Sequence, residues 1–146
     1  MALTVVITGA SRGIGKALAQ HFAAAGYELL LSARQAQGLE ATINALREQF
    51  PGITIHGKAA DLSIPEQATE LGRWCLSFSA PDILINNAGI IKRTPIIEME
   101  VEDFTAVITV DLISPFIVSK TVVKGMIQRG GGKIINICSM MKIGRA

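Results

Sequence analysis

The sequence has few cysteines, little net charge and no long apolar run, and each shortage excludes a class of protein. Only two of its 146 residues are cysteines, Cys75 and Cys138, and they do not form a Cys-x-x-Cys pair. This argues against both a zinc site and a disulfide framework. The formal net charge is only +2, and the Lys and Arg residues are scattered, which is not typical of a nucleic-acid-binding surface. We therefore expect no nucleic-acid partner and a reducing, cytoplasmic compartment.

No membrane or secretory segment is expected either. No apolar run approaches the roughly 18–20 residues that a membrane-spanning helix needs. The apolar start, residues 3–7, has no cationic lead and stops at Gly9, so it is too short for the core of a secretory signal. The chain is 49% hydrophobic, which is ordinary for a globular protein and sufficient for one core. We expect one domain, residues 1–146.

Short apolar runs alternate with longer amphipathic stretches along the chain. The apolar runs are residues 3–8, 28–33, 53–57, 82–86 and 133–138. Runs of this kind are typical of strands that are buried on both faces of a parallel sheet. Helical periodicity is found between them, at about residues 13–25, 36–50, 64–79 and 102–129. The alternation predicts an α/β fold of the Rossmann type, a doubly wound parallel sheet with about five strands.

Two local features refine this prediction. Ser63 and Glu66 are spaced as a capping box, and Pro65 lies in the first turn, so they should begin the third helix. At the other end, only eight residues follow the fifth run. A long apolar strand with an uncovered edge is an aggregation liability. We therefore expect the sequence to be the front part of a larger domain, with C-terminal strands and helices missing.

A glycine-rich loop connects the first strand to the first helix. Residues 8–15 read TGASRGIG, in which Gly9 suits a tight turn, Gly13 a close approach to a pyrophosphate and Gly15 helix–strand packing. The N–H groups at the start of the helix would then face an anion. A plain tight turn is the alternative interpretation. The loop lacks the Lys-Ser/Thr of a P-loop, so it favours a dinucleotide over ATP.

Three motifs, in this order, resemble the short-chain dehydrogenase/reductase family. They are TGxxxGxG at residues 8–15, NNAG at residues 86–89 after the fourth strand, and Ser139 after the fifth. More narrowly, residues 85–93, 110–120 and 133–141 are similar to the gluconate 5-dehydrogenase-like branch. The resemblance implies an oxidoreductase that acts on a small molecule, a sugar acid or a related ketone or alcohol. Reduction of a 3-oxoacyl thioester is an alternative within the same family.

The second strand indicates which dinucleotide would bind. NAD enzymes of this architecture place an acid at the carboxyl end of this strand, whereas here Arg34 follows it and Glu28 lies at its beginning. Arg34 and Arg12 would instead pair with a 2′-phosphate, so we expect NADP rather than NAD. The alternative is that both arginines are solvated surface charges.

The resemblance assigns further residues to the cofactor. Asp61 and Leu62 would contact the adenine, and the segment after the fourth strand would lie beside the cofactor, with Asn86 tying strands together. The expected cofactor-binding set is Gly9, Ser11, Arg12, Gly13, Ile14, Gly15, Arg34, Asp61, Leu62, Asn87, Ala88 and Gly89.

The catalytic set is incomplete. By resemblance, Ser139 would hydrogen-bond the reacting oxygen, and Asp111 occupies the position of the family's proton-relay Asn. An ionised Asp only accepts hydrogen bonds. Because Pro115 has no N–H, we hypothesise that the Asp111 carbonyl is free to hold a relay water.

The family's Tyr-x-x-x-Lys pair does not follow Ser139, and the single tyrosine is Tyr27. We therefore expect these 146 residues not to turn over substrate. A dinucleotide-binding module without chemistry is the alternative to a truncated enzyme. The resemblance also implies that the helix at residues 102–129 packs between subunits, which would make the intact protein a homo-oligomer.

Overall fold

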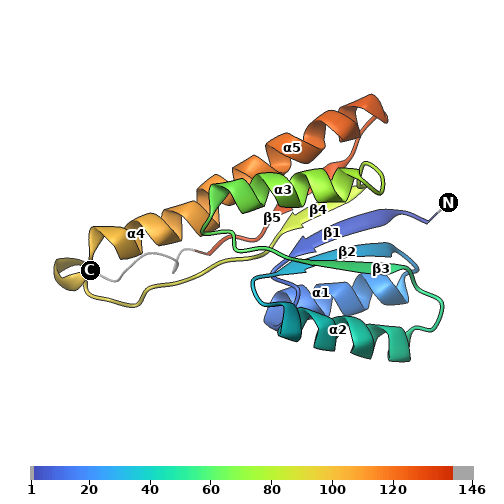
Figure 1. Ribbon diagram of the computed structural model, residues 1–146, viewed down its shortest axis with the longest axis horizontal. Coiled ribbons are helices and arrows are strands. Elements are labelled where there is room, and N and C mark those ends of the chain that lie inside the picture. The colour runs from blue at the N-terminus through green and yellow to red at the C-terminus, as the bar shows by residue number, and fades with distance from the viewer. Residues whose placement is uncertain (1, 140–146) are drawn as a thin grey trace.

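The computed structural model describes residues 2–139, which form a parallel sheet between two layers of helices (Figure 1). The strands are β1 (Thr4–Thr8), β2 (Glu28–Ala33), β3 (Ile55–Ala59), β4 (Ile83–Asn86) and β5 (Lys133–Asn136). The helices are α1 (Gly13–Ala24), α2 (Ala36–Gln49), α3 (Pro65–Leu76), α4 (Val101–Ile108) and α5 (Ser114–Gln128), with a 3-10 turn η1 (Ile96–Glu98) and a π-helical segment η2 (Thr109–Ile113). The strand order is β3-β2-β1-β4-β5, and every pairing is parallel. The predicted Rossmann-type α/β fold is confirmed.

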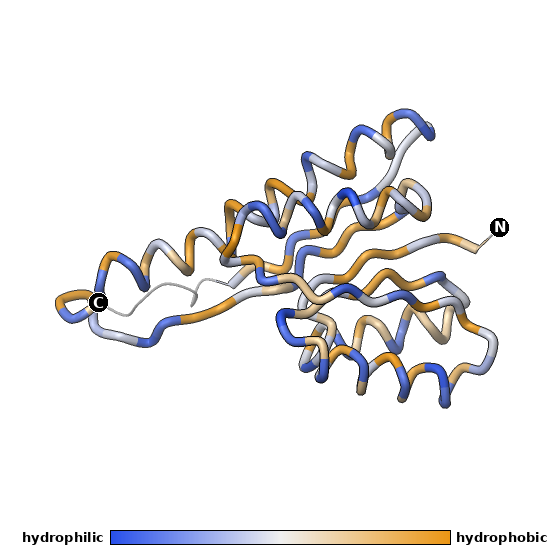
Figure 2. Tube along the Cα trace, in the orientation of Figure 1, coloured by the Kyte–Doolittle hydropathy of each residue, from blue (hydrophilic) through white to orange (hydrophobic). Residues whose placement is uncertain are grey.

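The central strands are buried on both faces because successive side chains point to opposite sides of a sheet. Val5 and Ile7 of β1 belong to the core beneath α1 and α2. Val6, between them, packs in the second core with Leu30 and Leu84, beneath α3 and α5. Figure 1 shows these two helix pairs on opposite sides of the sheet, and Figure 2 shows the apolar strand residues between them. The continuous apolar run is therefore the sequence signature of two cores sharing one sheet.

The outer strands differ from the expected double burial. β3 is buried at Ile55 and is half-buried or exposed along the rest of its length, and β5 is exposed throughout. Of the described strands, only β4 pairs with β5. The prediction is correct for β1 and wrong for β3 and β5, because burial depends on the neighbours of a strand as well as on its composition.

The predicted helix at residues 102–129 is not one regular helix. α4 and α5 are joined by the π-helical segment Thr109–Ile113, where the Ser114 N–H bonds to the Thr109 carbonyl. Pro115 follows immediately, and it cannot donate the ordinary helical hydrogen bond to the Asp111 carbonyl. A wider turn accommodates this missing donor. Asp111 therefore lies at an irregularity in the helix.

The predicted capping box is wrong. α3 begins at Pro65 with Ile64 as its cap residue and no side-chain cap bond. The Ser63 hydroxyl and backbone N–H instead donate to Oδ1 of Asp61, at 2.7 and 2.9 Å, because a carboxylate two residues away is a nearer acceptor. The placement of Pro65 in the first turn is confirmed.

The stretch from α4 to α5 is a longer apolar segment than the sequence analysis expected. Val101–Gln128 spans 28 helical residues, and among the described residues it alone is long and apolar enough to cross a membrane by length and composition. The expectation that no segment approaches this length was wrong, because the spaced charges hide its overall hydropathy. Val118 and Val122 are fully buried in the core of the protein, and a core helix meets the same criterion.

Candidate functional site

The predicted cofactor residues come together at the carboxyl edge of the sheet. One pocket at this edge is lined by all of them except Gly15: Gly9, Ser11, Arg12, Gly13, Ile14, Arg34, Asp61, Leu62, Asn87, Ala88 and Gly89. They are supplied by the segments that follow β1, β2, β3 and β4. Ligands bind at this edge in open parallel sheets, where the loops converge.

The glycine loop makes close backbone contacts at Gly9 and Gly15. Gly9 has φ +66°, and a Cβ there would lie 2.8 Å from Cα of Ala88. Gly13 has φ +53° and open space where a Cβ would stand, which leaves its backbone accessible to a ligand. A Cβ on Gly15 would overlap the carbonyl oxygen of Gly9. Gly15 therefore permits the loop to fold against itself, and this contact is with the loop rather than with the strand that we expected.

Thr8 fastens the glycine loop to the segment after β4. Its Oγ1 accepts hydrogen bonds from the backbone N–H groups of Asn87 and Ala88, at 3.1 and 3.0 Å. The Asn87 amide returns two contacts, donating to the carbonyls of Thr8 and Gly9 at 3.0 and 3.2 Å. Thr8 is 1% exposed. These hydrogen bonds were not predicted, although a threonine at the end of a buried strand, directly before a glycine turn, is a signal for them.

Asn86 connects three elements beneath the pocket. Its side-chain amide donates to Oγ of Ser119 on α5 at 3.0 Å and to Oδ1 of Asn136 on β5 at 2.9 Å. It is 4% exposed, and a buried amide needs such partners. The geometry agrees with the expectation that Asn86 ties strands together, and it adds Asn136, which the sequence analysis did not single out.

Two arginines line the part of the pocket beyond the ends of β1 and β2. Arg34 follows the carboxyl end of β2 and lines the same pocket as Arg12. Asp61 lies there too, and the hydrogen bonds from the Ser63 side chain and backbone, with a smaller effect of the Arg34 charge, hold the pKa of its carboxyl group below the ordinary value. Asp61 is therefore an ionised acceptor at neutral pH.

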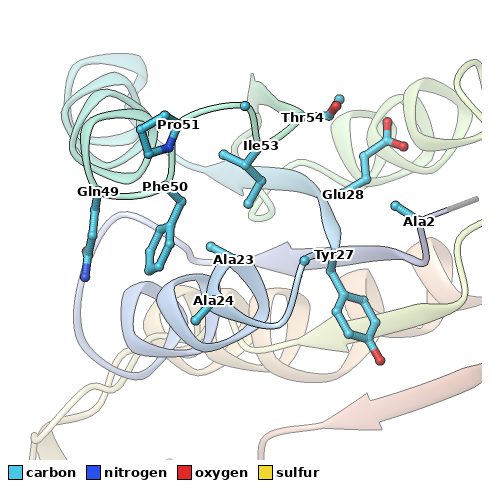
Figure 3. Close-up of a pocket in the computed structure, with 12 residues that line it drawn as sticks. Ala2, Ala23, Ala24, Tyr27, Glu28, Gln49, Phe50, Pro51, Ile53 and Thr54 are labelled. Atoms are coloured by element: carbon cyan, nitrogen blue, oxygen red, sulfur yellow. The ribbon is translucent and has the colours of Figure 1, made fainter.

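A second pocket, at the opposite edge of the sheet, contains none of the predicted site residues. Figure 3 shows Tyr27, Glu28 and Phe50 around it. Glu28 is the first residue of β2, which confirms that it cannot act as the acid at the carboxyl end of the strand. Tyr27, the single tyrosine of the chain, likewise lies at the amino edge.

The two catalytic candidates lie on different elements. Oδ1 of Asp111, in the π-helical segment, accepts a hydrogen bond from the Ile90 N–H at 2.9 Å, and the neighbouring Val110 lines the pocket. Ser139 is exposed and follows the carboxyl end of β5, so it belongs to the same edge of the sheet. Met140 and Met141, the last residues of the resemblance, lie outside the described residues.

Comparison with known proteins identifies the family. The sequence profile of the short chain dehydrogenase family matches residues 3–144. The chain belongs to this family. The glycine loop, the segment after β4 and Ser139, which carry the resemblance to this family, all lie within the matched residues.

The curated relatives include two sugar-acid dehydrogenases. The chain is 42% identical over 143 residues to a 2-dehydro-3-deoxy-D-gluconate 5-dehydrogenase of Formosa agariphila, covering 96% of this chain and 53% of the relative. It is 34% identical to a gluconate 5-dehydrogenase of Gluconobacter oxydans, covering 92% and 52%. A 3-oxoacyl-[acyl-carrier-protein] reductase of Synechocystis is 36% identical, covering 95% and 56%. The chain thus spans about half the length of the curated relatives it matches.

A solved structure shows the same arrangement. L-Sorbose reductase from Gluconobacter frateurii, complexed with NADPH and L-sorbose, superposes with a TM-score of 0.90 at 34% identity, over 95% of this chain and 53% of that one. The fold of the described residues is therefore that of about half of such a dehydrogenase chain.

Proposed function

We propose that this chain binds NADP and forms the cofactor-binding part of an oxidoreductase that acts on a sugar acid or a related ketone or alcohol. The choice of NADP rests on one observation: Arg12 and Arg34 line the same pocket, and no acid lies at the carboxyl end of β2. Guanidinium groups match the geometry and charge of a phosphate. The names of the two sugar-acid dehydrogenases support the substrate class.

The residues of the pocket fit a dinucleotide. The backbone of the glycine loop and the start of α1 would hold the pyrophosphate, since helix N-termini present N–H groups to anions. The open space above Gly13 leaves room for it. Arg12 and Arg34 would hold the 2′-phosphate, and the Asp61 carboxylate would accept from the adenine amine. When bound, NADP supplies the hydride chemistry.

The chain's own residues cover part of the acid–base work. Ser139 would donate a hydrogen bond to the reacting oxygen and orient it. Asp111 would fix the segment after β4 through the Ile90 N–H and stand where the family has its relay Asn. A serine hydroxyl is a poor proton acceptor at neutral pH, and Tyr27 is at the wrong edge. We therefore propose that these 146 residues bind cofactor without turnover, and that catalysis needs the family's Tyr-x-x-x-Lys segment.

Two alternatives have their own support. The likeness to the Synechocystis protein favours reduction of a 3-oxoacyl thioester. A dinucleotide-binding module without chemistry is the second alternative, and the pocket at the carboxyl edge of the sheet would serve it equally well. Assaying the chain joined to a Tyr-x-x-x-Lys segment from the family separates these functions: oxidation of gluconate, reduction of an acyl thioester, or neither.

Assembly and compartment are part of the same proposal. Val101, Leu112 and Phe116 are 63–72% exposed along α4, η2 and the start of α5, and this apolar surface supports a homo-oligomer of the intact protein. A cytoplasmic location is supported by the cysteines, because Cys75 and Cys138 are both free thiols.

Replacing Arg34 tests the cofactor choice. Arg34→Ala should weaken binding of NADPH about ten- to a hundredfold, because a hydrogen bond to a charged group contributes roughly 1.5–3 kcal/mol, and it should weaken NADH much less. Calorimetric titration of the 146-residue chain with both nucleotides measures this. Arg73→Ala is the matched control, because Arg73 is an exposed arginine on α3 outside the pocket. Equal losses for the two nucleotides would show that Arg34 does not contact a 2′-phosphate.

A further inference from the structure

α2 lies directly against the glycine loop, through a contact that the cofactor residues do not explain. Gly38, in its first turn, has no side chain, and a Cβ there would stand 3.5 Å from Cβ of Ser11. One turn later, Thr42 is 1% exposed. Its Oγ1 lies 3.2 Å from the carbonyl oxygen of Ser11 and 3.2 Å from that of Gly38.

The hydroxyl of Thr42 has two acceptors and one proton. A helical threonine commonly donates to the carbonyl four residues before it, which here is Gly38. The carbonyl of Ser11 offers an equally distant alternative from a segment 31 residues away. Thr42 is therefore the point at which α2 can hydrogen-bond to the glycine loop.

A hydrogen bond from Thr42 to the Ser11 carbonyl would restrain the backbone of Arg12. In a trans peptide the C=O and the following N–H point in opposite directions, so holding the Ser11 carbonyl toward α2 directs the Arg12 N–H away from α2. The Arg12 carbonyl is fixed as well, since it accepts the first hydrogen bond of α1 from Lys16 at 3.2 Å. Both peptide planes beside Arg12 are then held.

The same hydrogen bond would also restrain the segment that carries Arg34. The chain from Ser32 to Thr42 touches the glycine loop at both ends: the Ala10 N–H donates to the Ser32 carbonyl at 2.9 Å, and Thr42 reaches Ser11. Arg34 lies between these two attachments. The separation between Arg12 and Arg34 therefore depends on both of them.

We propose that Thr42 is a positioning residue for cofactor selection, whose hydroxyl sets the spacing of the two arginines across which a 2′-phosphate would bind. The inference rests on the proposed NADP function and adds a residue outside the pocket to it. Thr42 would not touch the cofactor. Its effect should therefore fall on NADPH, which carries the 2′-phosphate, and leave NADH nearly unchanged.

Three variants of the 146-residue chain test this. Thr42→Val keeps the shape and removes the hydroxyl, and it should weaken NADPH about fivefold, the effect of one neutral hydrogen bond, with less than about a twofold change for NADH. Thr42→Ser keeps the hydroxyl and should restore the NADPH/NADH ratio. Thr69→Val is the matched control, because Thr69 donates only to the carbonyl four residues before it, Pro65, at 3.4 Å, and it should leave the ratio unchanged.

Competition by adenosine 2′,5′-bisphosphate and by AMP repeats the comparison without the nicotinamide half, and thermal melts report whether each variant is folded. Equal weakening of NADPH and NADH in Thr42→Val would indicate a general structural role and overturn the proposal. Loss of the ratio in Thr42→Ser would also overturn it, because packing of the methyl group would then be responsible. If the unsubstituted chain binds NADPH no better than NADH, the proposed cofactor choice fails first. If the unsubstituted chain clearly prefers NADPH and Thr42→Val has the same NADPH/NADH affinity ratio, only the proposed role of Thr42 is overturned.

Discussion

β2 and β5 have similar apolar sequences and opposite environments. Leu29, Leu30 and Leu31 are 0% exposed, whereas Ile134 and Ile135 are 38% and 42% exposed. β2 pairs with β1 and β3 and lies between two helical layers, whereas among the described strands β5 pairs only with β4. The comparison shows that an apolar sequence allows a strand to be buried, and that the neighbouring strands and helices determine how much of it is buried.

β5 is held by its pairing with β4 and by polar contacts near its two ends rather than by burial. At the amino end, Asp82 accepts from Arg129 at 2.8 Å and from the Thr4 N–H at 2.7 Å, and its own carbonyl accepts from the Lys133 N–H at 2.9 Å. At the carboxyl end, Asn86 and Asn136 pair at 2.9 Å. Hydrogen bonds that contribute little in a well-packed strand are therefore expected to decide whether β5 stays in register.

The largest expected difference between the two strands is in the free energy of unfolding. Leu30→Ala should destabilise the chain by about 2–5 kcal/mol, because it leaves a cavity in a close-packed core. Ile135→Ala should cost about 1 kcal/mol or less, because its side chain already contacts solvent. Urea denaturation of both variants at one low protein concentration measures this. Similar losses for the two strands would mean that β5 is buried in solution, for example by self-association.

Much of β2 and less of β5 was accessible from the sequence, for a physical reason. The burial of β2, the glycine loop and the position of Arg34 follow from residues close together in the chain, which local patterns describe well. The uncovered edge of β5 was expected too, but the Asn86–Asn136 pair was not, because it joins residues 50 apart in the chain. The capping-box prediction for Ser63 failed for a local reason. The Ser63 hydroxyl had two possible partners, the start of α3 and the Asp61 carboxylate, and it donates to the carboxylate.

The next largest effect is expected at Asp82. Asp82→Asn leaves one acceptor oxygen where two donors, Thr4 N–H and Arg129, now bind, so one of them loses its partner. We expect a loss of about 1.5–3 kcal/mol and faster hydrogen exchange of the Ile135 amide than of the Leu30 amide. Asp103→Asn is the control: its ion pair with Lys92, at 3.0 Å, is on the surface, with 44% and 40% of the two side chains exposed, and should contribute less than about 1 kcal/mol. Equal exchange at β2 and β5 would indicate global unfolding rather than release of the edge strand.

A smaller effect is expected on self-association, which should depend on the exposed strand β5. An exposed apolar edge strand is a template for pairing with another chain, so we expect the 146-residue chain to associate as its concentration rises. Ile135→Lys places a charge on β5 and should raise the monomer fraction in size-exclusion chromatography with light scattering. Leu3→Lys, which alters a residue 50% exposed before β1, should not. A monodisperse parent chain with a sharp cooperative melt would contradict the account of β5.

The smallest effect is expected at Asp61, beyond the end of β3, the other outer strand. Its pKa is lowered, first by the hydrogen bond from the Ser63 side chain and then by the one from the Ser63 backbone, with the charge of Arg34 contributing least. A carboxyl group whose folded pKa lies below its unfolded value stabilises the folded chain above the unfolded pKa, and this stabilisation is lost as the pH falls through the folded pKa.

Ser63→Ala removes the largest cause of the lowered Asp61 pKa and should raise the folded pKa, so the loss of stability should begin at a higher pH. Carbon-detected NMR titration of the Asp61 carboxyl group in the two chains measures this directly, with Ser77→Ala as the control, because the Ser77 hydroxyl donates to the Trp74 carbonyl instead of to a carboxylate. An Asp61 titration unchanged by Ser63→Ala would show that the hydroxyl does not hold the carboxylate in solution. The β3 edge would then lack the local acid-dependent contact that we assign to it.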